Sequence, residues 1–357
     1  MPKNNNPKKT KLTKTLAFSE TRSSIDVILD STGRILQKVT KQKKTPAAWA
    51  SAMTIAIAAM LIVYLAAAAT GGLSQNGYRT IVSGGALIFV NFLLAKKAFD
   101  RTFSTLRNEL TEGLMSSAGL EGFRNWLNSA HNLARPIIIS VLVYTVYTAF
   151  IFWDPNEALV PVELIVMSGI MLIWTGFILY YMFLYAILPL NLNACTLRLH
   201  REDPASTQLL GDWNRMINFA AYMFAVMLAL GTLFTLSLAP LSLRTMIFIV
   251  PRWLLLIVLF VINQVTLSGL ITRSKRDTLR EIEAKMAGLR ARKRSPENAK
   301  LQKVMQLWDY HVRVRGTRNT VLNFRGIVNF ISTLLIPFLA FLLANLEAII
   351  KLFGWGN

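Results

Sequence analysis

Cysteine is almost absent from this chain, and its scarcity excludes two kinds of chemistry. Cys195 is the single cysteine, so the chain can form neither an intramolecular disulfide nor a metal cluster held by several thiolates. Histidine is also rare, with His131, His200 and His311 each in a different polar segment. The run 200–203 (His-Arg-Glu-Asp) lacks the helical spacing and the further ligands of a closed zinc site. We therefore expect no bound metal.

Charged residues are scarce, and acidic residues are the scarcest. Charged residues make up 16% of the chain, whereas hydrophobic residues make up 53%. Soluble domains contain roughly a quarter charged residues. Several uncharged runs approach or exceed the roughly 18 to 20 residues with which a helix crosses a bilayer. The composition predicts an all-α, polytopic integral membrane protein.

Polar groups suited to catalysis are missing from the apolar runs. None of these runs holds a serine together with a histidine, or a pair of aspartates, which excludes intramembrane proteases of the serine and aspartyl types. No glycine-rich phosphate loop with its lysine is present. The first 46 residues lack the apolar core and cleavage site of a secretory signal. We predict a protein that is not an enzyme and that has no cofactor.

Positive charge is concentrated in a few segments. Of the 39 Lys and Arg residues, 35 fall in segments 1–46, 96–135, 190–216 and 272–325. By the positive-inside rule these segments are cytoplasmic, which predicts a multi-pass protein of the cell membrane with its N-terminus inside. Topology thus accounts for the net charge of +20, so nucleic acid is not an expected partner, whereas anionic lipid headgroups are.

Hydropathy and charge together divide the chain into eight segments, with seven transmembrane helices, or six if the last apolar run does not cross. The segments are a basic cytoplasmic tail (1–46), a transmembrane hairpin (47–95), cytoplasmic or interfacial amphipathic helices (96–135), a second transmembrane hairpin (136–188), a cytoplasmic connection (189–216), a third transmembrane hairpin (217–271), a basic cytoplasmic helical hairpin (272–326) and a final transmembrane helix (327–350). In 96–135, Trp126 beside basic residues predicts a helix that lies among the lipid headgroups.

The segment 272–326 has the periodicity of two packed helices. The apolar residues recur at spacings of three and four, as Leu279, Ile282, Met286 and Leu289 in the first arm and as Leu301, Met305, Trp308 and Val312 in the second. Between the arms, Ser295-Pro296-Glu297 supplies an N-cap, a proline at the first helical position and an acid in the first turn. The pattern predicts an antiparallel hairpin of coiled-coil type that reaches roughly 35 Å from the membrane. The alternative is two separate helices lying on the surface.

Two sets of residues are candidates for function. Asn91, Asn263 and Gln264 lie within apolar runs, where polar groups are costly, and are candidates for a polar membrane path. The alternative is that these amides form hydrogen bonds between neighbouring helices. The candidates for cytoplasmic interaction are the seam residues and the basic cluster between the arms, namely Ile282, Met305, Trp308, Arg290, Arg292, Lys293 and Arg294.

These patterns favour a membrane-embedded scaffold or assembly component with a basic cytoplasmic platform. Such a protein would be a homo-oligomer or a subunit of a membrane complex. The alternative function is an oligomeric channel or transporter lined by small and amide side chains. Charge is almost absent from the middle of the apolar runs, which argues against an ion-coupled transporter. A pore between subunits, however, needs no buried charge.

Overall fold

A computed structural model describes residues 22–41, 44–74, 76–106, 120–151, 162–194, 197, 199–238, 243–291, 297–321 and 332. These residues form an all-helical fold that contains no β-strand. Five helices in the described part are long and apolar enough to cross a membrane. The sequence prediction of an all-α chain with helices of membrane length is therefore confirmed.

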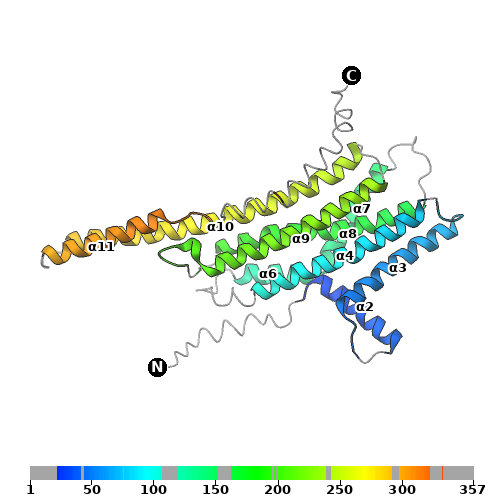
Figure 1. Ribbon diagram of the computed structural model, residues 1–357, viewed down its shortest axis with the longest axis horizontal. Coiled ribbons are helices and arrows are strands. Elements are labelled where there is room, and N and C mark those ends of the chain that lie inside the picture. The colour runs from blue at the N-terminus through cyan, green and yellow to red at the C-terminus, as the bar shows by residue number, and fades with distance from the viewer. Residues whose placement is uncertain are drawn as a thin grey trace, which may run out of the picture.

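The long helices run side by side along the molecule (Figure 1). They are α3 (Ala48–Ala69), α4 (Gly77–Thr105), α8 (Val162–Ile187), α9 (Gln208–Leu238) and α10 (Leu243–Ala291). The shorter apolar helix α7 (Ala134–Ile151) packs on α8. We call the end of the bundle where α4 ends and α9 begins the basic end, because Lys97, Arg101 and Arg215 gather there. Helices α2 (Ser24–Thr40) and α6 (Leu120–His131) contact each other beside it, and the 3₁₀ helices η3 (Leu188–Ala194) and η4 (Pro204–Ser206) connect α8 to α9.

Small residues set how closely the helices approach. Gly84 and Gly85 lie inside α4 without breaking it. A Cβ atom added at Gly84 would overlap the side chain of Met167 on α8, and one added at Gly85 would overlap Met60 on α3. On α3, Ala52 is fully buried. Because membrane helices associate through close packing, these positions need small residues.

Aromatic rings of α8 form much of the core near the basic end. Tyr181 and Tyr185 both contact Phe99 of α4, with ring centroids 4.8 Å and 5.5 Å apart. Their hydroxyl groups are also paired, Tyr185 with Thr102 at 2.6 Å and Tyr181 with Ser24 at the start of α2. Aromatic pairs of this kind add roughly 0.5–1.5 kcal/mol each beyond the area that they bury. The rings therefore hold α2, α4 and α8 together.

The N-terminal segment is more structured than a basic tail. Helix α2 begins with a capping box in which Ser23 and Asp26 satisfy each other's backbone N–H groups. Ile25 is fully buried, and Leu29 is nearly so. Asp26 also accepts a hydrogen bond from Nζ of Lys96 at 2.9 Å. Segment 24–40 is therefore docked on the end of the bundle.

The side chain of Trp126 lies inside the bundle, where it contacts protein and not lipid. Its side chain is 3% exposed, and its Nε1 donates a hydrogen bond to the carbonyl oxygen of Leu184 at 2.7 Å. The reason is that α4 continues for about three turns beyond the apolar run that ends at Ala95. Phe99 and Phe103, in this continuation, extend the core over which α6 packs.

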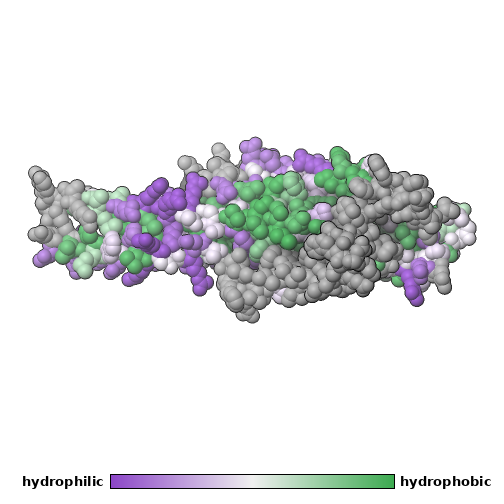
Figure 2. All heavy atoms as spheres, turned by 90° about the horizontal axis from the view of Figure 1, so that it is seen from above, coloured by the Kyte–Doolittle hydropathy of each residue, from purple (hydrophilic) through white to green (hydrophobic). Residues whose placement is uncertain are grey.

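Helix α10 is one continuous helix of 49 residues. At 1.5 Å per residue it is roughly 70 Å long, more than twice the thickness of the hydrocarbon core of a bilayer. Helix α11 (Glu297–Gly316) runs antiparallel to its far part, where His311 Nε2 lies 3.2 Å from Glu283 and Lys275 donates to the carbonyl oxygen of Thr317 at 2.8 Å. Figure 1 shows this pair projecting beyond the bundle. In Figure 2, hydrophobic residues gather over the middle of the molecule and hydrophilic residues gather where the projection leaves it.

Candidate functional site

Four amide side chains meet between α9 and α10. Oδ1 of Asn214 accepts hydrogen bonds from Asn263 Nδ2 at 3.2 Å, from Gln264 Nε2 at 2.9 Å and from Asn218 Nδ2 at 3.4 Å. Asn263 is fully buried and Asn214 is 9% exposed. We call these four residues the amide cluster. One carbonyl oxygen thus serves three donors, which ties α10 to the first turns of α9.

The same arrangement leaves three acceptors unused. Oδ1 of Asn218, Oδ1 of Asn263 and Oε1 of Gln264 are buried and have no hydrogen-bond partner in the described part of the chain. Each of these oxygens belongs to an amide group whose nitrogen donates to Asn214. A buried polar group without a partner costs about 1–3 kcal/mol. The amide cluster therefore has the capacity to bind a hydrogen-bond donor or a cation.

The structure brings together only two of the three amides predicted for a polar path. Asn263 and Gln264 both belong to the amide cluster. Asn91 lies on α4, is 2% exposed, and has no hydrogen bond to the cluster among the described residues. Sequence reasoning missed Asn214 because the predicted third transmembrane hairpin began at Ile217 and left Asn214 in the polar connection. It also missed Asn218, which lies one residue inside that hairpin. The spacing of four residues between the two, which places both on one helix face, was the available signal.

The projecting pair of helices has its own small core. Ile282 and Met286 of α10 pack with Val314 of α11, and all three are buried. Leu307 and Tyr310 of α11 are partly buried against them. The first-arm residues Leu279, Ile282 and Met286 therefore face α11, as their periodicity suggested. Leu289 of that predicted seam is outside this core and is partly buried.

The second arm presents a different face from the one predicted. The residues expected to face α10 are instead exposed, namely Leu301 at 63%, Met305 at 62%, Trp308 at 56% and Val312 at 52%. Their spacings of four, three and four residues place them in one continuous row along α11. We call this row the α11 stripe. Its only described ring contact is between Trp308 and His311, at a centroid distance of 5.7 Å.

The segment that carries the α11 stripe is rich in basic residues. Segment 272–325 contains 15 Lys and Arg residues but only five Asp and Glu residues. Glu281 is shared between Lys285, at 2.7 Å, and Arg201, at 3.6 Å. The predicted basic cluster itself is not placed, because Arg292, Lys293, Arg294 and the side chain of Arg290 lie outside the described residues. The last predicted span, 327–350, also lies outside them, apart from the backbone at Ser332.

Among the described residues, no three His, Cys, Asp or Glu side chains gather into a group that could hold a metal ion. Comparison of the chain with protein-family profiles, with curated proteins and with solved structures found no match.

Proposed function

We propose that this protein is a non-enzymatic, membrane-embedded scaffold whose α10–α11 hairpin docks a partner on its cytoplasmic side. The observation that supports this function is the α11 stripe, in which four large apolar side chains in one row are each more than half exposed. Single exposed apolar residues are ordinary, but a continuous row on a projecting helix is typical of an interaction surface. Its coiled-coil spacing favours a helix as the occupant.

The α11 stripe alone is too small to account for the binding free energy of a stable complex. Full burial of one large apolar side chain contributes roughly 1.5–3 kcal/mol, so burying the exposed parts of these four contributes roughly 4–7 kcal/mol. A micromolar complex needs about 8 kcal/mol after the cost of association is met. The stripe is therefore the centre of the contact, and further contacts must come from the residues around it.

The positive charge of the hairpin segment favours an acidic partner. The threefold excess of basic over acidic residues in 272–325 repels a second copy of the same hairpin and attracts acidic side chains. We therefore assign the surface to a helix of another protein that has an apolar face with acidic residues on either side.

The stripe can be tested without disturbing the fold, because its residues are exposed. Met305→Asp with Trp308→Asp places two charges in the row, and Gln302→Asp with Gln306→Asp adds the same charge at two exposed positions beside it. A photo-cross-linker at position 301 then reports the neighbour in intact membranes. We expect cross-links to an acidic partner that persist in the glutamine variant and are lost in the stripe variant.

Two results would contradict this proposal. Cross-links that join only copies of this chain would assign the stripe to self-association, and cross-links that survive Met305→Asp with Trp308→Asp would remove the stripe from the contact. Ile282→Asp is a separate test of the hairpin itself, because Ile282 is 3% exposed and packs between the two arms. The non-enzymatic assignment is contradicted by a stoichiometric metal or nucleotide in the purified protein.

The proposed topology has seven transmembrane helices and a cytoplasmic N-terminus in the cell membrane. The five helices of membrane length and the segregation of 35 of 39 basic residues support it. Helix α7, at 18 residues, would be the third span, and segment 327–350 would be the seventh. Reporter fusions after Lys97, Glu157, Arg294 and Asn357 test the order, with Lys97 and Arg294 expected inside. A reporter after Arg294 that scores outside would contradict it.

The amide cluster supports a second candidate function, an oligomeric channel or transporter. Three buried oxygens without partners in the described residues could accept hydrogen bonds or a cation from a passing solute. Flux of ions and small solutes into liposomes tests this function with the native chain, Asn263→Leu and Asn91→Leu. Selective flux that is lost in Asn263→Leu would make the cluster part of a pathway. Flux no greater than that of empty liposomes would favour the scaffold.

A further inference from the structure

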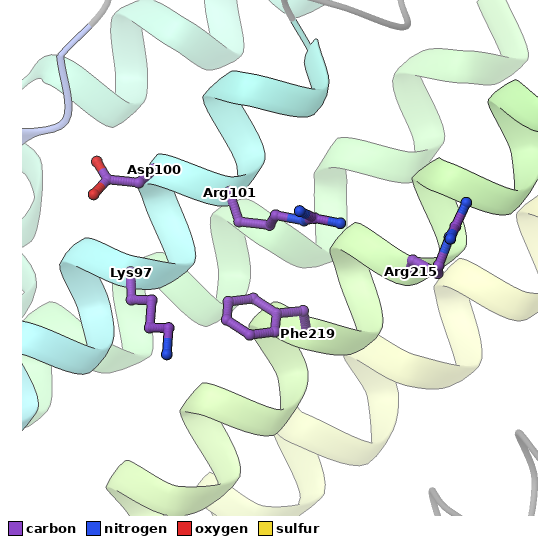
Figure 3. A pocket seen from close by; sticks show the side chains of 5 residues that line it. All are labelled: Lys97, Asp100, Arg101, Arg215 and Phe219. Carbon is purple, nitrogen blue, oxygen red and sulfur yellow. The ribbon is translucent and has the colours of Figure 1, made fainter.

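A groove opens between α4 and α9 at the basic end of the bundle. It has a volume of about 580 Å³ and is lined by Lys97, Asp100 and Arg101 of α4 and by Arg215 and Phe219 of α9. Figure 3 shows Arg101 extending from α4 toward α9, with Phe219 between the two helices. Asp100 points away from Phe219 in the same view. The groove therefore presents cations from both helices above an aromatic ring.

Two of the three cations that line the groove have no partner in the described part of the chain. Among the described residues, neither Lys97 nor Arg101 has a hydrogen-bond or ion-pair partner, and both are exposed. Asp100 is already engaged by Lys96, at 3.0 Å. Arg215 pairs with Asp212 on its own helix. Lys97 and Arg101 are thus available to an anion, and Arg215 adds a third positive charge on the facing helix although it pairs with Asp212.

On each helix that lines the groove, an apolar residue lies about one turn from a cationic residue. On α4, Leu94 is followed on the same face by Lys97 and Arg101, at spacings of three and four residues. On α9, which runs in the opposite direction, Arg215 is followed one turn later by Phe219 (Figure 1). The apolar run of α4 ends at Ala95, just before these cations. An occupant must therefore have an anionic end and an apolar end.

We propose that this groove binds an anionic phospholipid, with its phosphate among Lys97, Arg101 and Arg215 and an acyl chain against Phe219. Arginine forms paired hydrogen bonds with phosphate oxygens, and lysine adds a point charge. Basic pockets between helices at the cytoplasmic face of a membrane are suited to such headgroups. A free phosphate would use the cations but would leave the apolar half of the groove empty. This inference does not depend on the scaffold function.

Native mass spectrometry of the full chain in detergent tests the site. The probes are phosphatidylglycerol, phosphatidylcholine with the same acyl chains, and inorganic phosphate. The site variant is Lys97→Gln with Arg101→Gln and Arg215→Gln. The matched control is Arg273→Gln with Arg276→Gln and Arg280→Gln, which removes the same charge from exposed positions on α10.

The expected result is a large and local loss of affinity. At about fivefold for each cation near an anionic lipid, the site variant should bind phosphatidylglycerol about a hundredfold more weakly, while the α10 control keeps native affinity. If the site variant fails to fold, Arg101→Gln alone should still weaken binding about fivefold. Phe219→Ala should weaken the binding of phosphatidylglycerol and leave any binding of phosphate unchanged.

Three results would overturn the assignment. Equal losses in the site variant and the α10 control would mean that the lipid responds to net charge and not to a site. Displacement of phosphatidylglycerol by inorganic phosphate at similar concentrations would make the groove a site for free anions. Equal binding of phosphatidylcholine and phosphatidylglycerol by the native chain would remove the role of headgroup charge.

Discussion

Replacement of Asn214 by leucine should destabilise the protein far more than the same replacement of Asn263, although Asn263 is the more deeply buried. Oδ1 of Asn214 is the shared acceptor, so Asn214→Leu leaves donors on Asn263, Gln264 and Asn218 without their partner. One of these donors is fully buried, and the other two are partly buried. At about 1–3 kcal/mol for a fully buried group and less for the others, the expected cost is about 2–4 kcal/mol.

Asn263→Leu has two effects that oppose each other. It removes one hydrogen bond, at a cost of about 1 kcal/mol, but it also removes a buried oxygen that has no partner among the described residues. The free energy of unfolding should therefore stay within about 1 kcal/mol of the native value. Asn214 still accepts two hydrogen bonds in this variant.

Steric trapping in bicelles measures the free energy of unfolding of each single variant. The double variant then measures the coupling energy between Asn214 and Asn263. Asn214→Leu with Asn263→Leu should be less destabilised than the sum of the two single variants, by about 1–2 kcal/mol, because the buried donor is absent. Asn91→Leu is the matched control, since Asn91 is buried outside the cluster and should not couple to Asn214. A larger cost for Asn263→Leu than for Asn214→Leu would refute the reasoning, because the oxygen of Asn263 would then have a partner in the folded protein.

Two further predictions concern packing, and the midpoint of thermal unfolding in detergent checks both. Trp126→Phe keeps an aromatic ring but removes the hydrogen bond to Leu184, so it should cost about 1–2 kcal/mol; an unchanged midpoint would contradict this burial. Gly176→Ala should cost about 1–3 kcal/mol, because the new Cβ would overlap the backbone of Ser140 and push α7 from α8. Gly231→Ala is its control, since nothing lies within 4 Å of a Cβ there, and it should be neutral or slightly stabilising.

Hydropathy located the long helices, but it did not show how far they continue beyond their apolar runs. The run that ends at Ala95 located α4, yet the helix extends to Thr105 because Phe99 and Phe103 pack on α8 and α6. Two charged residues between these rings, Asp100 and Arg101, are exposed and lower the average hydropathy of the segment. At the basic end, the part of α4 that follows the apolar run therefore still packs in the core.

The face that α11 presents to α10 could not be chosen from periodicity, because α11 has two apolar faces. One carries Leu301, Met305 and Trp308, and the other carries Leu307 and Val314. The first has the larger side chains and the more regular spacing, yet the second is the one that packs. Contacts outside the pattern, such as that of Lys275 with the carbonyl oxygen of Thr317, accompany this choice of register.

The unbroken course of α10 has a mechanical consequence. From Arg252 to Ala291 it contains no proline, so Asn263 in the bundle and Ile282 in the hairpin lie on one rod, roughly 28 Å apart along its axis. A helix bends only gently over such a length. A sideways force on the hairpin therefore acts as torque on the part of α10 inside the bundle, where Asn263 donates a hydrogen bond to Asn214. A partner that binds α11 would therefore transmit force through α10 to the interior of the bundle.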